Sequence, residues 1–195
     1  MEFSKSETKI NLMRAFAGES QARNRYNMAA HQAKKDGYNV VQSLFDYIAC
    51  QEQAHAKVFY DHLKEVNDEH FMIDASYPVN VYSNTLDLLK AAVHNEMEEH
   101  DDIYKKFGDV AKEEGFLGIA SSFEMIAKIE KTHAEKFDAF AKKIEANNLF
   151  ERGEQTAWYC TNCGHIHMGP SAPQVCPVCH HARGYFLSGD MNKQF

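Results

Sequence analysis

Apolar side chains recur at alternating steps of three and four residues through most of the first 146 positions. One such series runs through Val41, Phe45 and Ile48, and a similar one begins at Ile119 and Phe123. Side chains with this spacing share one face of an α-helix. The pattern predicts four long helices, over about residues 5–36, 39–67, 85–115 and 116–146. Each would extend roughly 45 Å, and helices of that length are typical of bundles.

The ends of these helices predict the topology. The first helix is expected to begin at a capping box formed by Ser4 and Glu7 and to end at Asp36-Gly37. Only a few residues join the first helix to the second and the third to the fourth, so each pair must be antiparallel. A stretch of about 17 residues that contains Pro78 joins the two pairs and is long enough to cross the bundle. The predicted fold class is therefore an all-α, ferritin-like four-helix bundle with one long crossover.

Two Glu-x-x-His pairs interrupt the apolar faces of the second and fourth helices. Glu52 and His55 follow Ile48 at the same helical spacing, and Glu130 and His133 take the corresponding place in the fourth helix. A lone buried carboxylate is unfavourable unless it is protonated or paired with a cation. Several such groups on one interior face therefore indicate bound metal ions. The alternative is a pair of solvated surface features, which would follow if the predicted faces were shifted by one position.

The first and third helices add three carboxylates. Glu19 lies 33 positions before Glu52, and Glu96 lies 34 positions before Glu130, which suggests a duplicated helix pair. The symmetry breaks three residues later, where the third helix carries Glu99 and the first carries alanine. Five carboxylates and two imidazoles would then point into one interior, as in di-iron carboxylate bundles. Carboxylate-rich ligation favours iron or manganese over zinc.

Two tyrosines lie near these acids. Tyr26 follows Glu19 by seven residues on the same face, and Tyr104 follows Glu99 by five. Such residues are often packed core aromatics whose hydroxyl is tied to a polar partner. Because the nearest partners would be the acids, we expect both hydroxyls to orient ligand carboxylates. Cys50 is expected to be a small residue of the core.

The last part of the chain differs in composition from the first. Residues 147–157 lose the helical periodicity, so we divide the chain into a bundle (1–146), a linker (147–157) and a small domain (158–195). The small domain contains two Cys-x-x-Cys pairs separated by twelve residues, namely Cys160, Cys163, Cys176 and Cys179. Four thiolates on two tight turns predict a tetrahedral site for zinc or iron. A structural zinc ribbon is one interpretation, but a redox bundle beside the site favours iron.

Aromatic side chains border these cysteines. We expect a small core around the metal from Trp158, Tyr159, Tyr185 and Phe186. Such a domain could not hold a core without the metal.

Composition and charge narrow the class of protein. A net charge of −7 argues against nucleic acid and against an anionic membrane surface as partners. No apolar run reaches the length of a signal peptide or of a membrane span. Four of the five cysteines form two Cys-x-x-Cys pairs, and in a reducing compartment that pattern favours a metal over disulfides. We therefore expect a cytoplasmic protein.

The chain resembles the rubrerythrins along essentially its whole length. The segment FAGESQARNRY, from Phe16 to Tyr26, is close to that family's first-helix motif. The two Glu-x-x-His pairs, the Glu96-x-x-Glu99 pair and the Cys-x-x-Cys-Gly…Cys-Pro-x-Cys tail follow in the family's order. The resemblance implies a non-haem di-iron centre in the bundle and a rubredoxin-like Fe(Cys)4 domain after it. One departure is His165, where the family commonly has an aromatic residue.

The resemblance also implies a role for each residue. Glu19 and Glu99 would serve one iron, Glu96 and His133 the other, with Glu52 and Glu130 bridging, and in the family His55 replaces the carboxylate equivalent to Glu99 on reduction. The expected metal ligands are thus Glu19, Glu52, His55, Glu96, Glu99, Glu130 and His133 in the bundle, and Cys160, Cys163, Cys176 and Cys179 in the tail. The expected catalytic residues are Glu99, His55, Tyr26 and Tyr104.

The activity implied is reduction of hydrogen peroxide to water in oxidative stress defence. Electrons would pass singly through the Fe(Cys)4 centre from a rubredoxin or an NAD(P)H-dependent reductase. No G-x-G-x-x-G follows a predicted strand, so nicotinamide is not expected to bind within this chain. The linker spans at most ~35 Å, less than the bundle, so we expect the tail to serve a partner subunit in a head-to-tail homodimer.

Two other functions compete with this one. The first is a ferroxidase and storage protein of the ferritin type, in which a four-cysteine tail has no evident purpose. The second is a zinc-ribbon adaptor with a structural bundle.

Overall fold

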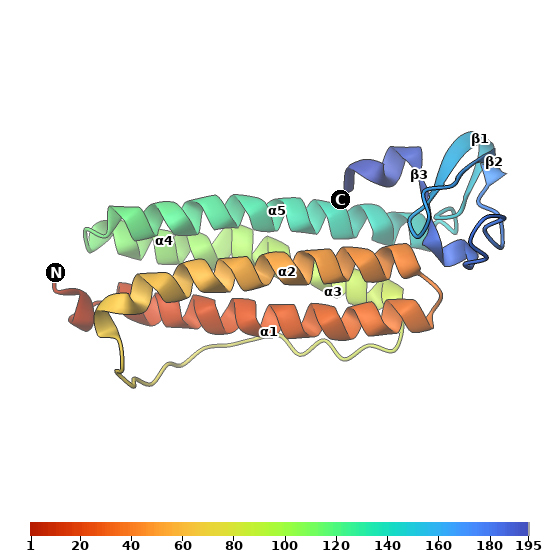
Figure 1. The fold of residues 1–195 in the computed structure, drawn as a ribbon. Helices are drawn as coiled ribbons and strands as arrows, with labels where there is room; N and C mark the ends of the chain where they lie inside the picture. Colours follow the sequence, from red (N-terminus) through yellow and green to blue (C-terminus); the bar gives the residue numbers. More distant parts are fainter. Residues whose placement is uncertain (195) are drawn as a thin grey trace.

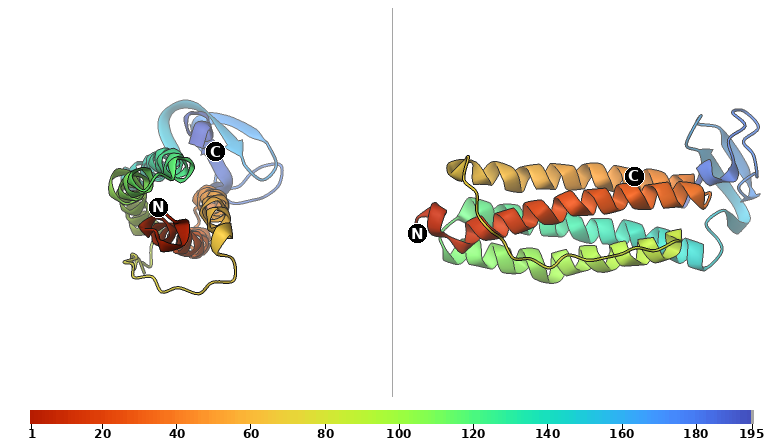
Figure 2. Two further views of the ribbon diagram at one scale, coloured as in Figure 1. Left: turned by 90° about the vertical axis from the view of Figure 1, so that its left-hand side faces the viewer. Right: turned by 90° about the horizontal axis from the view of Figure 1, so that it is seen from below.

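The computed structural model describes residues 1–194, with side chains described as far as Met191, and the protein is an elongated helical bundle with a small domain at one end (Figure 1). The helices are α1 (Glu7–Lys35), α2 (Asn39–His62), α3 (Thr85–Glu98), α4 (Tyr104–Glu113) and α5 (Leu117–Glu145). α3 and α4 follow one another along a single rod, so the bundle has four members, seen end-on in Figure 2. The predicted ferritin-like class is confirmed. Within the described residues, none of the helices combines the length and apolar character needed to cross a membrane.

The first helix begins two residues later than predicted. The Ser6 hydroxyl accepts a hydrogen bond from the Lys9 backbone N–H at 3.1 Å, whereas Ser4 lies in a short 3-10 turn. Ser6 is therefore the N-cap, and the Ser4 capping box is wrong. The other end agrees with the prediction: α1 ends at Lys35, and Gly37 has a φ of 84° in the turn to α2.

The third rod is not one continuous helix. A π-helical segment, Glu99–Ile103, joins α3 to α4, which corrects the prediction of a single uninterrupted helix. A π-helical turn takes up one residue more than an α-helical turn. The two halves of the sequence differ by that one residue, because Tyr104 follows Glu96 by eight positions whereas Tyr26 follows Glu19 by seven.

The segment between α2 and α3 crosses the length of the bundle on the outside, beside α1 and the third rod (Figures 1 and 2). The Arg14 guanidinium pairs with the Asp74 carboxylate at 2.7 Å, and the Tyr77 hydroxyl donates to the Arg14 carbonyl at 2.9 Å. Further along, the Asn95 amide donates to Asn80 Oδ1 at 2.8 Å. The crossover therefore lies against the bundle and starts α3 at the end where α2 starts.

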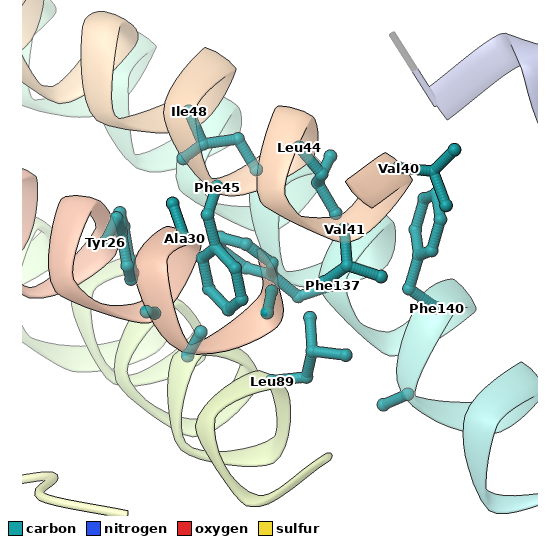
Figure 3. Close-up of a cluster of buried hydrophobic side chains, with 14 of the residues drawn as sticks. Tyr26, Ala30, Val40, Val41, Leu44, Phe45, Ile48, Leu89, Phe137 and Phe140 are labelled. Atoms are coloured by element: carbon teal, nitrogen blue, oxygen red, sulfur yellow. The ribbon is translucent and has the colours of Figure 1, made fainter. Parts of the chain in front are cut away.

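The interior of the bundle contains two apolar blocks with a polar band between them. One block includes Tyr26, Phe45 and Phe137 and lies toward the α1–α2 turn (Figure 3). The other includes Phe59 and Phe123 and lies toward the opposite end. The predicted acids and histidines occur along the helices between these blocks. Well-packed apolar ends therefore position the polar band.

The C-terminal part is a three-stranded antiparallel sheet in the order β2-β1-β3, formed by β1 (Glu151–Cys160), β2 (Ile166–Ser171) and β3 (Phe186–Ser188). β1 begins inside the segment predicted as a linker. Trp158 and Phe186 are fully buried in the small core, against which Tyr185 packs. The predicted domain, 158–195, ends one residue outside the described range.

The small domain packs against the bundle. Leu187 and Met191 belong to the same buried cluster as the α1 and α2 side chains. Gly184 lies so close to the α1–α2 turn that a Cβ on it would meet the Gly37 carbonyl oxygen at 2.0 Å. The tail is therefore held at the turn end of its own bundle.

Candidate metal centres

Six of the predicted ligands meet in the middle of the bundle. They come from four elements: Glu19 from α1, Glu52 and His55 from α2, Glu96 from α3, and Glu130 and His133 from α5. All six are buried, and Glu19 and Glu130 expose none of their surface. The surface interpretation of the Glu-x-x-His pairs is therefore wrong.

These residues form two groups of four that share two members. Glu19, Glu52, His55 and Glu130 form one group, and Glu52, Glu96, Glu130 and His133 form the other. Within each group, the candidate ligand atoms lie within 4.8 Å of one another. Glu52 and Glu130 belong to both, so two metal ions held here would share two carboxylates.

The donor atoms converge without satisfying one another. His133 Nδ1 lies 3.0 Å from Glu52 Oε1 and 2.8 Å from Glu130 Oε2, yet none of these three atoms has a hydrogen-bond partner. Buried polar atoms are almost always partnered in folded proteins. Glu19 Oε2 and Glu96 Oε2 are buried and unpartnered in the same way. Oxygen and nitrogen atoms that face a common centre without hydrogen-bond partners fit a pair of metal ions.

Without metal, the buried acids and histidines of this cluster have pKa values far from their usual ones. Burial and the neighbouring carboxylates raise the pKa of Glu96 to about 8 and that of Glu19 well above its usual value. Burial also opposes the charge on Glu52, but the imidazoles of His133 and His55, at 3.0 and 3.1 Å, outweigh it and lower the Glu52 pKa to about 2. Burial disfavours the His133 imidazolium as well, yet its carboxylate partners raise the pKa to about 12. Cations are thus favoured at this centre.

Both predicted tyrosines touch ligand carboxylates. The Tyr104 hydroxyl donates to Glu19 Oε1 at 2.5 Å, and the Tyr26 hydroxyl donates to Glu96 Oε1. Each tyrosine therefore reaches across to the carboxylate of the other half of the repeat. Burial raises the pKa of both hydroxyls well above the usual value, so both stay protonated donors.

Glu99 is placed differently from the other predicted ligands. It begins the π-helical segment and belongs to neither group of four, whereas His55 is present in the group that contains Glu19. His55 Nδ1 lies 3.0 Å from Glu130 Oε1 and 3.1 Å from Glu52 Oε2. In this structure His55 rather than Glu99 belongs to the groups of candidate ligands, and the role of Glu99 as a ligand stays a prediction.

Sequence reasoning missed one polar contact of the centre. The far nitrogen of His133, Nε2, lies 3.0 Å from Gln51 Oε1, and the Gln51 amide donates to the Tyr47 hydroxyl at 3.1 Å. Gln51 thus accepts the Nε2 proton and leaves Nδ1 of His133 free to face the acids. The available signal was that Gln51 precedes Glu52 directly. Cys50, in contrast, is exposed and not part of the core, which corrects the prediction.

The four cysteines of the tail also meet. Cys160 Sγ lies 3.7 Å from Cys179 Sγ, and Cys163 Sγ lies 3.7 Å from Cys176 Sγ. All four sulfur atoms lie within 4.8 Å of one another and none is in a disulfide, which fits a tetrahedral thiolate site.

Two similar turns carry these cysteines. The backbone N–H of Cys160 donates to His165, and that of Cys176 donates to His181, both at 2.8 Å. Gly164 has the positive φ that the sequence predicts, and His180 takes the same conformation in the second turn, with a φ of 59°. The backbone N–H of His181 lowers the pKa of the Cys179 thiol to about 5, which favours the thiolate that a metal requires.

Comparison with known proteins identifies the family to which this chain belongs. The rubrerythrin family model matches residues 11–141, and the model for the rubredoxin-like domain of rubrerythrin matches residues 158–187. Rubrerythrin-1 of Clostridium acetobutylicum is 44% identical over 183 residues, which cover 93% of each chain. The chain belongs to the rubrerythrin family. Rubrerythrin of Nitratidesulfovibrio vulgaris is 40% identical over 181 residues, again 93% of each chain.

A solved structure agrees with this family. Fully reduced, all-ferrous nigerythrin matches with a TM-score of 0.64 at 28% identity, over 93% of this chain and 86% of that chain. This rubrerythrin therefore has a di-iron site held by carboxylates and imidazoles, and a rubredoxin-like four-cysteine iron site. The rubredoxin-like match favours iron over a structural zinc ribbon in the tail. As a rubrerythrin, the chain belongs to a family of peroxidase-type oxidoreductases.

Proposed function

We propose that this rubrerythrin reduces hydrogen peroxide to water. The observation that carries the proposal is the pair of buried four-residue groups that share Glu52 and Glu130, because it holds two metals together inside the bundle. The reaction consumes one peroxide, two electrons and two protons, breaks the O–O bond and releases two water molecules. When bound, two irons supply both electrons together and bind the oxygens of the breaking bond.

The chain's own residues position this chemistry. We assign the metal ligands as Glu19, Glu52, Glu96, Glu130 and His133, with Glu99 as a further ligand that His55 would replace when the centre is reduced. Tyr26 and Tyr104 hold Glu96 and Glu19 through hydroxyl protons, which fixes the direction of the ligand oxygens. The apolar blocks on either side exclude water from the centre.

Electrons would return through the four-cysteine site of a partner subunit. The tail contacts its own bundle at Gly37 and Asn39, and Glu52 lies thirteen residues further along α2, about 20 Å away along the helix axis. A docked tail therefore stands far from its own di-iron site. This separation supports a head-to-tail homodimer, with a rubredoxin or an NAD(P)H-dependent reductase as the external donor. The four cysteines are thiols rather than disulfides, which also supports a cytoplasmic location.

Replacing Cys160 with serine tests the relay. We expect Cys160→Ser to abolish peroxide turnover in a rubredoxin-linked NADH system, while peroxide still oxidises the chemically reduced bundle in a single turnover. Cys50→Ser is the matched control, because Cys50 is exposed and lies outside both sites. Unchanged steady-state turnover in Cys160→Ser would contradict the relay. A reduced bundle that peroxide does not oxidise would contradict the peroxidase, and a multi-subunit cage with a mineral core would support iron storage instead.

A further inference from the structure

A cavity of about 460 Å³ lies under the crossover, between α1 and the third rod. Residues 74–78 of the crossover form its outer wall, and Gly18 and Phe107 line it from α1 and α4. The views in Figure 2 show the crossover passing along this side of the bundle. We refer to this space as the crossover cavity.

The inner end of the crossover cavity reaches the metal centre. Glu99 and Tyr104 both line it. Tyr104 donates its hydroxyl proton to Glu19, and Glu19 belongs to one of the two groups of ligands. Glu99 stands apart from those groups, at the start of the π-helical segment. A small molecule in the cavity would therefore lie against Glu99 and against the tyrosine that holds Glu19.

A glycine in the middle of α1 keeps this space open. Glycine inside a helix is less favourable than alanine by about 1 kcal/mol, so its presence needs a reason. A Cβ on Gly18 would lie 3.6 Å from Cε1 of Tyr77, so any larger side chain would extend into the cavity. The Tyr77 hydroxyl donates to the Arg14 carbonyl at 2.9 Å, which anchors the ring over Gly18.

The walls suit a small, uncharged, polar molecule. Gln21 and Asn95 offer amide donors and acceptors, and Ala15 and Phe107 supply apolar surface. Acidic side chains outnumber basic ones along the wall, which disfavours anions. Hydrogen peroxide is uncharged near neutral pH and both donates and accepts hydrogen bonds.

We propose that the crossover cavity is the entrance through which hydrogen peroxide reaches the di-iron centre, and that Tyr77 over Gly18 sets its width. The proposal rests on the peroxidase function proposed above. It assigns the cavity to small neutral hydroperoxides and gives Tyr77 the part of a specificity-determining residue. Bulkier organic hydroperoxides would be excluded by the Tyr77 ring, which lies over Gly18.

Two other cavities are rival routes: one of about 590 Å³ lies along α4 and α5 and is also lined by Tyr104, and the second approaches the ligands through Tyr26. The second has a volume of about 300 Å³, lies nearer the α1–α2 turn, and is lined by Tyr26 and Ala91. Tyr26 contacts Glu96, so this cavity too lies against a tyrosine that holds a ligand carboxylate. The routes are separable because Gly18 lines the crossover cavity and Ala91 lines the cavity beside Tyr26.

The test measures access separately from turnover. Nitric oxide is a small neutral probe whose binding to the reduced, iron-loaded protein is followed by stopped-flow absorbance. We expect Gly18→Leu to slow nitric oxide binding roughly tenfold, with unchanged iron content, because the leucine fills the passage. Ala91→Leu is the matched control and should leave the binding rate unchanged. Thermal unfolding of both variants checks that each remains folded.

A variant with the opposite effect makes the outcome decisive. Tyr77→Ala should widen the passage and raise the rate with tert-butyl hydroperoxide relative to hydrogen peroxide. Slower nitric oxide binding in Ala91→Leu alone, or unchanged behaviour in both Gly18→Leu and Tyr77→Ala, would overturn the proposal. If Gly18→Leu slows nitric oxide binding in a protein that does not reduce peroxide, the entrance stands and the peroxidase function fails.

Discussion

At the residue scale, two neighbouring acids of the bundle centre have pKa values shifted in opposite directions. Glu96 faces other carboxylates in a buried position, and its pKa rises to about 8. Glu52 is just as buried but lies beside the imidazoles of His133 and His55, and its pKa falls to about 2. The histidine partners therefore decide which acid carries charge before metal binds.

The metal-free protein should lose stability as pH rises. Glu96 and His55 have folded-state pKa values of about 8 and about 9, above their unfolded values, so each stabilises the fold at low pH and loses that contribution as pH rises through those values. Urea unfolding of the metal-free protein should give a free energy of unfolding that falls, by a few kcal/mol, from pH 5 to pH 9. Glu96→Gln should flatten the dependence. A free energy that rises over this range would contradict the assignment.

Gln51 should control metal affinity through His133. Because its side-chain oxygen holds the Nε2 proton of His133, removing it frees the ring to rotate and to change tautomer. Gln51→Ala should weaken iron binding roughly 10- to 100-fold, measured by competition with a chelator, with little change in helix content. Gln53→Ala is the control, since Gln53 is exposed on the same helix. Equal affinities in the two variants would show that the contact with Gln51 does not matter.

At the element scale, the helices could be predicted and their irregularities could not. The spacing of Phe45, Ile48 and Glu52 identifies the buried face because an α-helix repeats regularly along its length. The prediction for Cys50 rested on residue type alone and failed, because Cys50 lies off the buried face and is exposed. The prediction of the capping box also failed, because Ser4 and Ser6 are both good caps and only the fold selects one.

The π-helical segment shows why part of the site was not predictable. The extra residue between Glu96 and Tyr104 is visible in the sequence, but periodicity does not say where a helix takes it up. The π-helical segment begins at Glu99, so Tyr104 still reaches Glu19, while Glu99 falls outside the two groups of candidate ligands. Spacing alone placed Glu96 and Glu99 together on one face.

Deleting one residue of this segment should remove the irregularity without moving α4. Asp101 is exposed, and its loss would let α3 and α4 join as one regular helix with Tyr104 in place. We expect the metal-free protein without Asp101 to unfold at the same or a higher temperature, and peroxide turnover to fall at least roughly tenfold, because π-bulges persist at functional sites despite their poorer geometry.

Deleting Asp109, another exposed acid of the same rod, is the matched control. That deletion rotates the end of α4 and displaces the buried Ala111, so thermal stability should fall. If the two deletions destabilise equally, the π-helical segment is not a removable insertion.

At the scale of the whole molecule, the position of the tail depends on a contact between residues far apart in the sequence. Gly184 and Gly37 touch across the junction, and nothing in the local pattern around either glycine indicates the other. The spacing of the cysteines predicted the metal site of the tail. The position at which the tail docks on the bundle is known only from the folded structure. In the head-to-tail homodimer proposed above, the docked position would decide which di-iron site the tail serves.

Gly184→Ala should therefore detach the tail and leave both metal sites intact. The new Cβ would meet a backbone oxygen at 2.0 Å, and no side-chain rotation relieves that overlap, so the domain must move off the bundle. Gly189→Ala is the matched control, because its Cβ would find only ordinary contacts, the nearest at 3.5 Å. Small-angle scattering should show a more extended particle for Gly184→Ala alone, with the visible spectrum of the four-cysteine iron unchanged.

Peroxide turnover with the NADH-linked donor should fall roughly tenfold in the same variant, because a loosely tethered tail spends less time near the partner's di-iron site. Oxidation of the chemically reduced bundle by peroxide should stay at the control rate. A detached tail that sustains full turnover would mean that docking at Gly37 does not position the tail for electron transfer, and that the tail reaches a di-iron site by free diffusion on its tether.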